Sequence, residues 1–176
     1  GLIVIDTIYY EEQIKRHPRT QQIFSRFPNA RKIEIERYSE VFNKKDQNFK
    51  LQKLNPALIL AHKHEGHVLP TPEGFGIGGT KNFYFSHMYN CIYDCRYCFL
   101  QGMYASANYI LFVNYEDFKK KIEDTIYKNM DESITFFSGY DCDSLALENV
   151  TGFVSYILPL FEKYPKALLE FRTKSV

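Results

Sequence analysis

Strand-like and helix-like segments alternate along the second half of the sequence, and this alternation constrains the fold more than any other feature. Four short apolar segments rich in β-branched and aromatic residues cover residues 83–89, 109–113, 134–137 and 168–172. Strands that alternate with helices predict a parallel sheet with right-handed crossovers, which is an α/β fold.

Two amphipathic helices are expected between these strands, over residues 114–129 and 149–164. Asn114 is suited to cap the first helix, and the second helix is expected to begin at Asn149 or Thr151 and to kink at Pro159. The apolar residues expected on the inward faces recur at helical spacing: Phe118, Ile122 and Ile126 in the first helix, and Phe153, Ile157 and Phe161 in the second.

The first part of the chain is expected to form a small α/β region that packs on the second half. It has strand-like runs over residues 3–10, 32–38 and 57–61 and a short helix over 20–26. A loop with prolines and glycines over residues 70–80 predicts a division into a region 1–80 and a region 81–176. The sequence stops directly after a predicted strand, so we expect further βα units in the full protein.

Composition sets wide limits on the function. The 176 residues carry a net charge of +1, which gives no indication of nucleic-acid binding. No apolar run is long enough to span a membrane, and the start lacks the features of a signal peptide. We therefore expect a cytoplasmic protein that does not bind a membrane, and the sequence does not indicate an oligomeric state.

Three of the four cysteines lie close together at the end of a predicted strand. Cys91, Cys95 and Cys98 have the spacing C-x3-C-x2-C. Such crowding indicates a metal site in a reducing compartment rather than disulfides. Three thiolates around a 4Fe–4S cluster leave one iron open, whereas a cluster with four protein ligands only transfers electrons. The open iron could chelate the amino and carboxylate groups of a cofactor.

A zinc site is the alternative interpretation, with the three cysteines and His87 as ligands. Structural zinc usually takes its ligands from two separate pairs, and a second pair is absent from the sequence. His62, His64 and His67 also form a metal-like pattern, but a surface hairpin is the preferred interpretation because no carboxylate or cysteine follows at a recognised spacing.

The cysteine motif, with Tyr97 before its last cysteine, resembles the radical S-adenosylmethionine (SAM) superfamily. Within it, the stretch from Cys91 to Phe118, the strand end at 136–143 and the segment 171–174 resemble spore photoproduct lyase and its relatives. The resemblance covers about the first half of that family's chain. It implies a partial TIM-type (β/α)6 barrel, of which this chain holds the first βα units.

The resemblance also implies roles for individual residues. Cys91, Cys95 and Cys98 would hold the 4Fe–4S cluster. The residues expected to contact SAM are Tyr97 near the adenine, Ser138 and Gly139 at the methionine amine, Asp143 at the ribose and Lys174 at the methionine carboxylate. The family's reaction reverses a thymine dimer in spore DNA after a 5′-deoxyadenosyl radical abstracts hydrogen from the lesion. The implied partners are damaged DNA and an electron donor such as flavodoxin or ferredoxin.

Two positions depart from the family. Tyr140 stands where bacillus-type spore photoproduct lyases place a hydrogen-donating cysteine, and Cys142 is the nearest thiol. Phe99 stands where those enzymes have a tyrosine directly after the last cluster cysteine. Tyr140 and Cys142 are therefore both candidate hydrogen donors. Two alternatives stay open: a radical SAM enzyme that acts on a different substrate, and a non-catalytic iron–sulfur or zinc protein.

Overall fold

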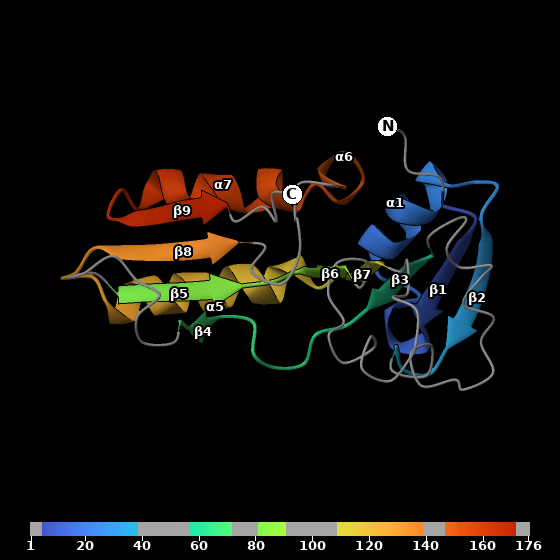
Figure 1. Ribbon diagram of the computed structural model, residues 1–176, viewed down its shortest axis with the longest axis horizontal. Helices are drawn as coiled ribbons and strands as arrows, with labels where there is room; N and C mark the ends of the chain where they lie inside the picture. Colours follow the sequence, from blue (N-terminus) through green and yellow to red (C-terminus); the bar gives the residue numbers. More distant parts are fainter. Residues whose placement is uncertain (1–4, 39–56, 72–80, 91–108, 139–146, 172–176) are drawn as a thin grey trace, which may run out of the picture. The chain divides into compact units, whose positions relative to one another are not determined.

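The computed structural model describes residues 5–38, 57–71, 81–90, 109–138 and 147–171 (Figure 1). The chain divides into two compact units, Gly1–His62 with Tyr89–Val113 and Lys63–Met88 with Asn114–Val176. These units are defined by contacts in space, and the predicted division at residue 80 along the chain stays a prediction. Within the described residues, no helix is both long enough and apolar enough to cross a membrane.

The first unit is built on a five-stranded sheet. Its strand order is β2 (Arg31–Ile35), β1 (Thr7–Glu11), β3 (Leu58–Ala61), β7 (Tyr109–Phe112) and β6 (Met88–Asn90). β1 pairs in parallel with β2 and with β3, and β3 pairs in parallel with β7. Every residue of β3 and β7 is buried, as expected for central strands of a parallel sheet.

A short helical segment connects β1 to β2. It consists of the 3-10 helix η1 (Glu12–Ile14) and the helix α1 (Pro18–Arg26). Pro18 occupies the first turn of α1, and Nδ1 of His17 accepts a hydrogen bond from the Arg19 backbone N–H at 3.1 Å. These two features fix the start of α1 two residues before the predicted start.

Glu11 joins the carboxyl ends of three strands in this unit. Its side chain is buried at the end of β1 and accepts hydrogen bonds from the backbone N–H of Tyr38, which follows β2, at 2.9 Å, and of His62, which follows β3, at 2.8 Å. Gln13 donates a third hydrogen bond, from Nε2 at 2.9 Å. One carboxylate therefore fixes the chain where it leaves three neighbouring strands.

The second unit contains a four-stranded sheet with the order β4 (Leu69–Pro70), β5 (Lys81–Phe85), β8 (Ile134–Ser138) and β9 (Ala167–Phe171). β4 is antiparallel to β5, whereas β5, β8 and β9 are parallel. The helices are α5 (Tyr115–Lys128), α6 (Glu148–Thr151) and α7 (Phe153–Lys163).

Phe153 is the residue at which the sheet and both long helices of this unit meet. At the start of α7, its ring lies 5.8 Å from Phe85 of β5, 4.9 Å from Tyr115 and 5.6 Å from Phe118 of α5, between ring centroids. The inward residues predicted for the two helices, 118, 122, 126, 153, 157 and 161, are all buried, which confirms the predicted faces.

The pairing of the strands differs from the prediction in two ways. Residues 83–89 form two strands, β5 and β6, because Ser86 and His87 interrupt the run, and the two strands lie in different sheets. β7 was expected in one sheet with the other strands of the second half, but it lies in the sheet of the first unit and pairs with β3. Both β3 and β7 are short, wholly apolar strands, and local sequence carries no information on which of several such strands lie side by side.

Two predicted helix features are also corrected. The helix predicted over 149–164 is broken at Gly152, which has φ +61°, and α7 continues through Pro159. Ser155, whose carbonyl loses its helical partner at Pro159, is exposed and can be hydrated. Asn114 precedes α5 as predicted, but its side chain does not cap the helix. It accepts from the Lys63 backbone N–H at 2.9 Å and donates to the Lys63 carbonyl at 2.7 Å.

Candidate functional site

Most of the predicted site residues lie outside the described residues. These are Cys91, Cys95, Tyr97, Cys98, Gly139, Tyr140, Cys142, Asp143 and Lys174. Their roles stay predictions. Ser138 is described, and so are the strands that directly precede the other positions, which allows the region to be examined from the sheet outward.

Three parallel strands of the second unit end at one edge of the sheet. The last residue of β8, Ser138, is in register with the last residue of β5, Phe85, and with the last residue of β9, Phe171. The three arrowheads point the same way in Figure 1. Along the chain, Gly139 follows Ser138 directly and Lys174 follows Phe171 by three residues. The carboxyl ends of parallel strands are where α/β folds place their binding residues.

The Ser138 side chain lies on the face of the sheet that α7 covers. Paired residues of parallel strands point to the same face, and the partner of Ser138, Phe85, contacts Phe153 of α7. Ser138 is completely buried, and its hydroxyl has no hydrogen-bond partner within the described residues. The hydroxyl of Ser138 therefore lies between the sheet and α7.

His87 lies on the same side, two residues after the end of β5. Its ring is fully buried and stacks on Phe153, with 3.9 Å between ring centroids and 9° between the ring planes, while Tyr115 meets it edge-on at 6.2 Å. Burial away from water lowers the pKa of His87 from 6.5 to about 3. The imidazole is therefore neutral at physiological pH, and in the described part of the chain neither ring nitrogen has a hydrogen-bond partner.

Two further buried hydroxyls without partners lie in this unit. Ser86 precedes His87, and Thr151 ends α6; the Oγ of Ser86 and the Oγ1 of Thr151 make no hydrogen bond among the described residues. Thr151 is linked to the ring cluster because its carbonyl accepts a 2.8 Å hydrogen bond from the Tyr115 hydroxyl. Buried polar atoms without partners are rare in proteins, and they concentrate here near the carboxyl edge of the sheet.

Sequence reasoning did not identify this set of buried polar residues. It considered His87 only as a fourth zinc ligand and Thr151 only as a possible helix start, and it did not consider Ser86. The available signal was the position of Ser86 and His87, two polar residues directly after an aromatic strand. Polar residues at this position can belong to a functional site at the carboxyl edge of a sheet, but the same pattern also occurs where a strand ends without such a site.

The histidines at 62, 64 and 67 are not arranged as a hairpin. They lie between β3 and β4, which belong to different sheets, so the predicted surface hairpin is wrong. His67 is bound locally: Nε2 hydrogen-bonds the Lys63 carbonyl at 2.8 Å, and its ring meets Phe118 edge-on at 5.1 Å. Within the described ranges, no three His, Cys, Asp or Glu side chains gather in a way that could hold a metal ion.

Comparisons with known proteins give a match in structure only. No family model matches the sequence, and no curated protein matches it. A doubly substituted spore photoproduct lyase with bound AdoMet and dinucleoside spore photoproduct matches with a TM-score of 0.75 at 13% identity, over 97% of this chain and 50% of that chain. A cysteine-to-alanine variant of the enzyme matches with a TM-score of 0.74 at 15% identity, over 99% and 51%.

The enzyme complexed with dinucleoside spore photoproduct also matches, with a TM-score of 0.72 at 13% identity, over 97% of this chain and 50% of that chain. This chain thus spans about half the length of the structures that it matches. The predicted α/β architecture and the resemblance to spore photoproduct lyase are confirmed as a likeness of fold. The chain has the fold of one half of spore photoproduct lyase, a partial radical SAM fold.

Proposed function

We propose that this chain provides the SAM-binding and cluster-binding part of a radical SAM enzyme that acts on a DNA photolesion. One observation carries the proposal: this chain combines three cysteines at C-x3-C-x2-C spacing with the fold of half of spore photoproduct lyase. One of the matching structures is a variant with AdoMet and dinucleoside spore photoproduct bound. Neither the motif nor the fold alone would support this substrate class.

The donor set of the motif fits a cluster with one open iron. Cys91, Cys95 and Cys98 supply three thiolates within eight residues, and the motif contains no fourth cysteine or histidine. When bound, the reduced cluster and SAM supply a 5′-deoxyadenosyl radical that abstracts hydrogen from a substrate. The role of this chain is to hold both groups and to keep water and oxidants away from them.

The proposed SAM-binding residues follow strands that end together. Gly139 and Asp143 come after Ser138 at the end of β8, and Lys174 comes after β9. SAM carries a positive sulfonium, so a nearby protonated histidine would be unfavourable. Because burial lowers the pKa of His87 to about 3, this residue adds no positive charge to the carboxyl edge of the sheet. A neutral His87 is thus compatible with a cationic cofactor at this edge.

The substrate assignment depends on the source of a hydrogen atom. A substrate radical must recover hydrogen after rearrangement, and Tyr140 and Cys142 are the candidate donors that follow β8. The departures at Phe99 and Tyr140 favour a second candidate function, a radical SAM enzyme that acts on a different substrate. The partners of the proposed reaction are damaged DNA and a flavodoxin-like or ferredoxin-like electron donor.

Anaerobic reconstitution with iron and sulfide tests the proposed class. The intact protein should become brown and, after reduction, convert SAM to 5′-deoxyadenosine and methionine. Replacing Cys95 with Ala should abolish iron incorporation or SAM cleavage, because a cluster with two protein thiolates is labile, whereas the matched variant Cys142→Ala should keep the cluster. A colourless protein that retains zinc would contradict the proposal.

A second assay tests the substrate. With dinucleoside spore photoproduct, the reconstituted protein should release the repaired dinucleotide, and Cys142→Ala or Tyr140→Phe should divert the product to adducts while SAM cleavage continues. A protein that cleaves SAM but leaves the lesion intact would exclude photolesion repair and leave the second candidate function.

A further inference from the structure

The second unit contains a cavity at the edge of its sheet opposite the candidate functional site. The cavity has a volume of about 510 Å³ and lies where β8 and β9 begin and where α5 and α7 end. This volume is within the range of small-molecule sites, which is about 300–1,000 Å³. Nothing in the proposed reaction uses this edge of the sheet.

The inner surface of the cavity is mainly apolar. Ile126 of α5, Ile134 of β8 and Ala167 of β9 are buried residues that contribute to it, and Met130 stands half-exposed at its mouth. Tyr164 adds an aromatic ring, held in place because its hydroxyl donates a 2.7 Å hydrogen bond to the Tyr127 hydroxyl. A thioether and an aromatic ring are both favourable surfaces for a planar ligand.

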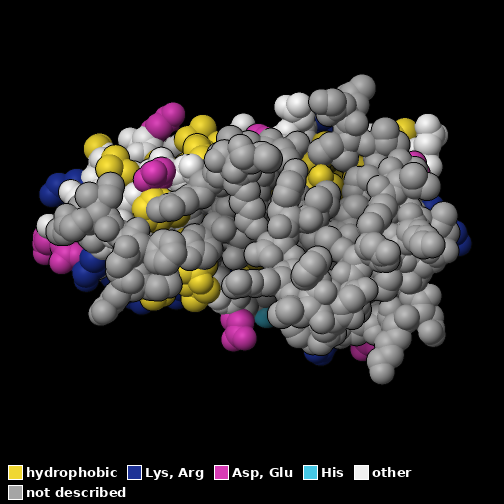
Figure 2. Space-filling view, viewed as in Figure 1, with side chains coloured by type: hydrophobic (Ala, Val, Ile, Leu, Met, Phe, Trp, Pro, Cys, Tyr) yellow, Lys and Arg dark blue, Asp and Glu magenta, His cyan; other side chains and the backbone are white. Residues whose placement is uncertain are grey.

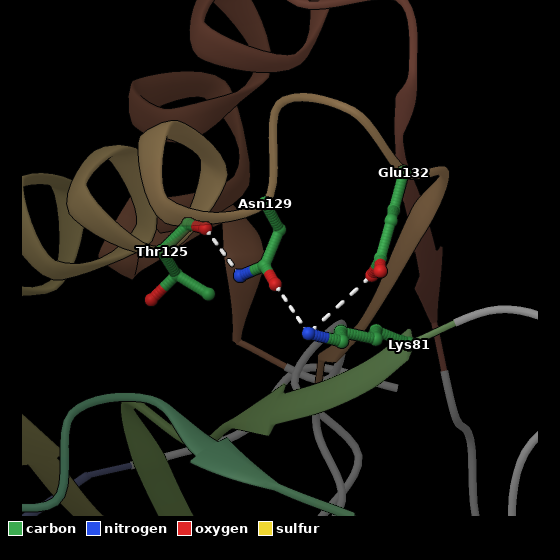
Figure 3. A network of polar contacts seen from close by, with 4 residues as sticks. All are labelled: Lys81, Thr125, Asn129 and Glu132. Carbon is green, nitrogen blue, oxygen red and sulfur yellow. Dashed lines mark hydrogen bonds and ion pairs between the residues drawn. The ribbon is translucent and has the colours of Figure 1, made fainter.

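One wall of the cavity is fixed by a polar network (Figure 3). The Lys81 ammonium, at the start of β5, donates to Oδ1 of Asn129 at 2.9 Å and lies 3.4 Å from a carboxylate oxygen of Glu132. Asn129 in turn donates to the Thr125 carbonyl of α5 at 2.8 Å. Glu132 is the acidic member of the described cavity lining, and Lys81 compensates its charge.

Two basic residues of the lining have no such compensation. Lys163 and Lys166 are exposed and form no ion pair within the residues that the structure describes; the Lys163 ammonium lies 5.4 Å from the centre of the Tyr164 ring. The carboxyl ends of α5 and α7 each contribute roughly half a negative charge, so the two lysines leave about one positive charge at the mouth. Figure 2 shows basic, acidic and hydrophobic side chains gathered at this end of the unit.

We infer that this cavity binds a small planar organic anion, with its ring between the apolar residues and its acidic group at Lys163 and Lys166. The charge at the mouth selects an anion, and the lining selects an aromatic body. The site is separate from the proposed SAM chemistry, because it lies at the amino ends of the strands whose carboxyl ends precede the predicted SAM-binding residues.

A pair of probes with the same ring system and opposite charges tests the inference. The ¹⁵N-labelled intact protein is titrated with 2-naphthoate or with 2-naphthylmethylamine, and amide shifts are followed by NMR. The anion should cause saturable shifts at residues 126–134 and 163–167, and the cation should not. Equal shifts with both probes, or no saturable shifts with the anion, would overturn the inference.

Charge variants provide the second part of the test. Lys163→Gln combined with Lys166→Gln should raise the dissociation constant of 2-naphthoate roughly fivefold or more, the effect of losing two exposed charge contacts. The matched control combines Lys119→Gln with Lys120→Gln. Lys119, on α5, also lies over a tyrosine ring, that of Tyr156 on α7. The same loss of affinity in both double variants would show a nonspecific charge effect and refute the site.

A third variant adds a negative charge at the mouth of the cavity and leaves both lysines in place. Met130→Glu places a carboxylate at a half-exposed position and should abolish binding of the anion, whereas Leu158→Glu, at a similarly exposed position on α7, should have no effect. Unchanged binding to the Met130 variant would place the anion elsewhere on the protein.

Discussion

Acidification should destabilise this protein through one buried side chain, His87. The imidazole is stacked on Phe153 without access to water, so the folded protein can accept a proton on it only at very low pH. In the unfolded chain the same imidazole is hydrated and takes up a proton near pH 6.5. Protonation therefore favours the unfolded state.

The magnitude follows from the two pKa values. The pKa of His87 is 6.5 when exposed and about 3 in the folded protein. The stabilisation is fully present above pH 6.5, and it is lost as the pH falls between the two values. Linkage gives a loss of roughly 1 kcal/mol at pH 5.5 and roughly 2–3 kcal/mol at pH 4.5, relative to neutral pH.

Urea unfolding at pH 7.5, 6.5, 5.5 and 4.5 measures this effect. Because carboxylates also titrate in this range, the quantity to compare is the difference in unfolding free energy between the wild type and His87→Phe at each pH. Phenylalanine keeps a ring against Phe153 but cannot be protonated. The difference should shift in favour of the variant by roughly 2–3 kcal/mol from pH 7.5 to pH 4.5.

A matched control separates the effect of His87 from that of a substitution as such. Leu158 is exposed and cannot be protonated, so the difference between the wild type and Leu158→Gln should stay nearly constant over the same pH range. His87→Gln provides a second neutral variant if phenylalanine does not fit the site. The reasoning would be refuted if, for both His87 variants, the difference in unfolding free energy from the wild type did not change with pH. That result would mean that His87 titrates equally in the folded and unfolded states.

Three further predictions concern single side chains. Glu11→Ala should lower the free energy of unfolding by roughly 3 kcal/mol, because three donors lose a charged acceptor, while the exposed neighbour Glu12→Ala should change it little in the same urea titration. Tyr115→Phe should cost about 1–2 kcal/mol by leaving the Thr151 carbonyl unpaired, and equal urea midpoints for variant and wild type would contradict the bond. Lys174→Ala should weaken SAM binding by about 1.5–3 kcal/mol without loss of iron, and an unchanged SAM affinity in equilibrium dialysis would make Lys174 a surface residue.

Local sequence patterns were sufficient to locate most of the regular structure. The strand over 134–137 was predicted within one residue, and the helix over 114–129 differs from α5 by one residue at each end. Both segments have strong periodicity and clear boundaries, which local reasoning uses well. The inward faces of both helices follow from the same periodicity.

Features set by distant contacts could not be predicted in this way. The pairing of β7 with β3 depends on which apolar strands meet in space. The burial of His87 could not be predicted from local sequence either, because Phe153, which covers its ring, is 66 positions away along the sequence. Of the predicted site residues, Ser138 is the one whose surroundings are now known.

The side chain of Asn114 has a consequence for the chemical ageing of the protein. Its amide group pairs with the backbone of Lys63 as a neighbouring strand would: the oxygen accepts from the N–H and the nitrogen donates to the carbonyl. The same nitrogen also donates to the Asp117 carboxylate at 2.8 Å. Spontaneous deamidation would replace that nitrogen with a negatively charged oxygen. The new oxygen would face a carbonyl and a carboxylate, so two attractive contacts would become repulsive at once. Loss of a single ammonia molecule would thus weaken the link between the segment after β3 and the start of α5, leaving only the bond from the Lys63 N–H.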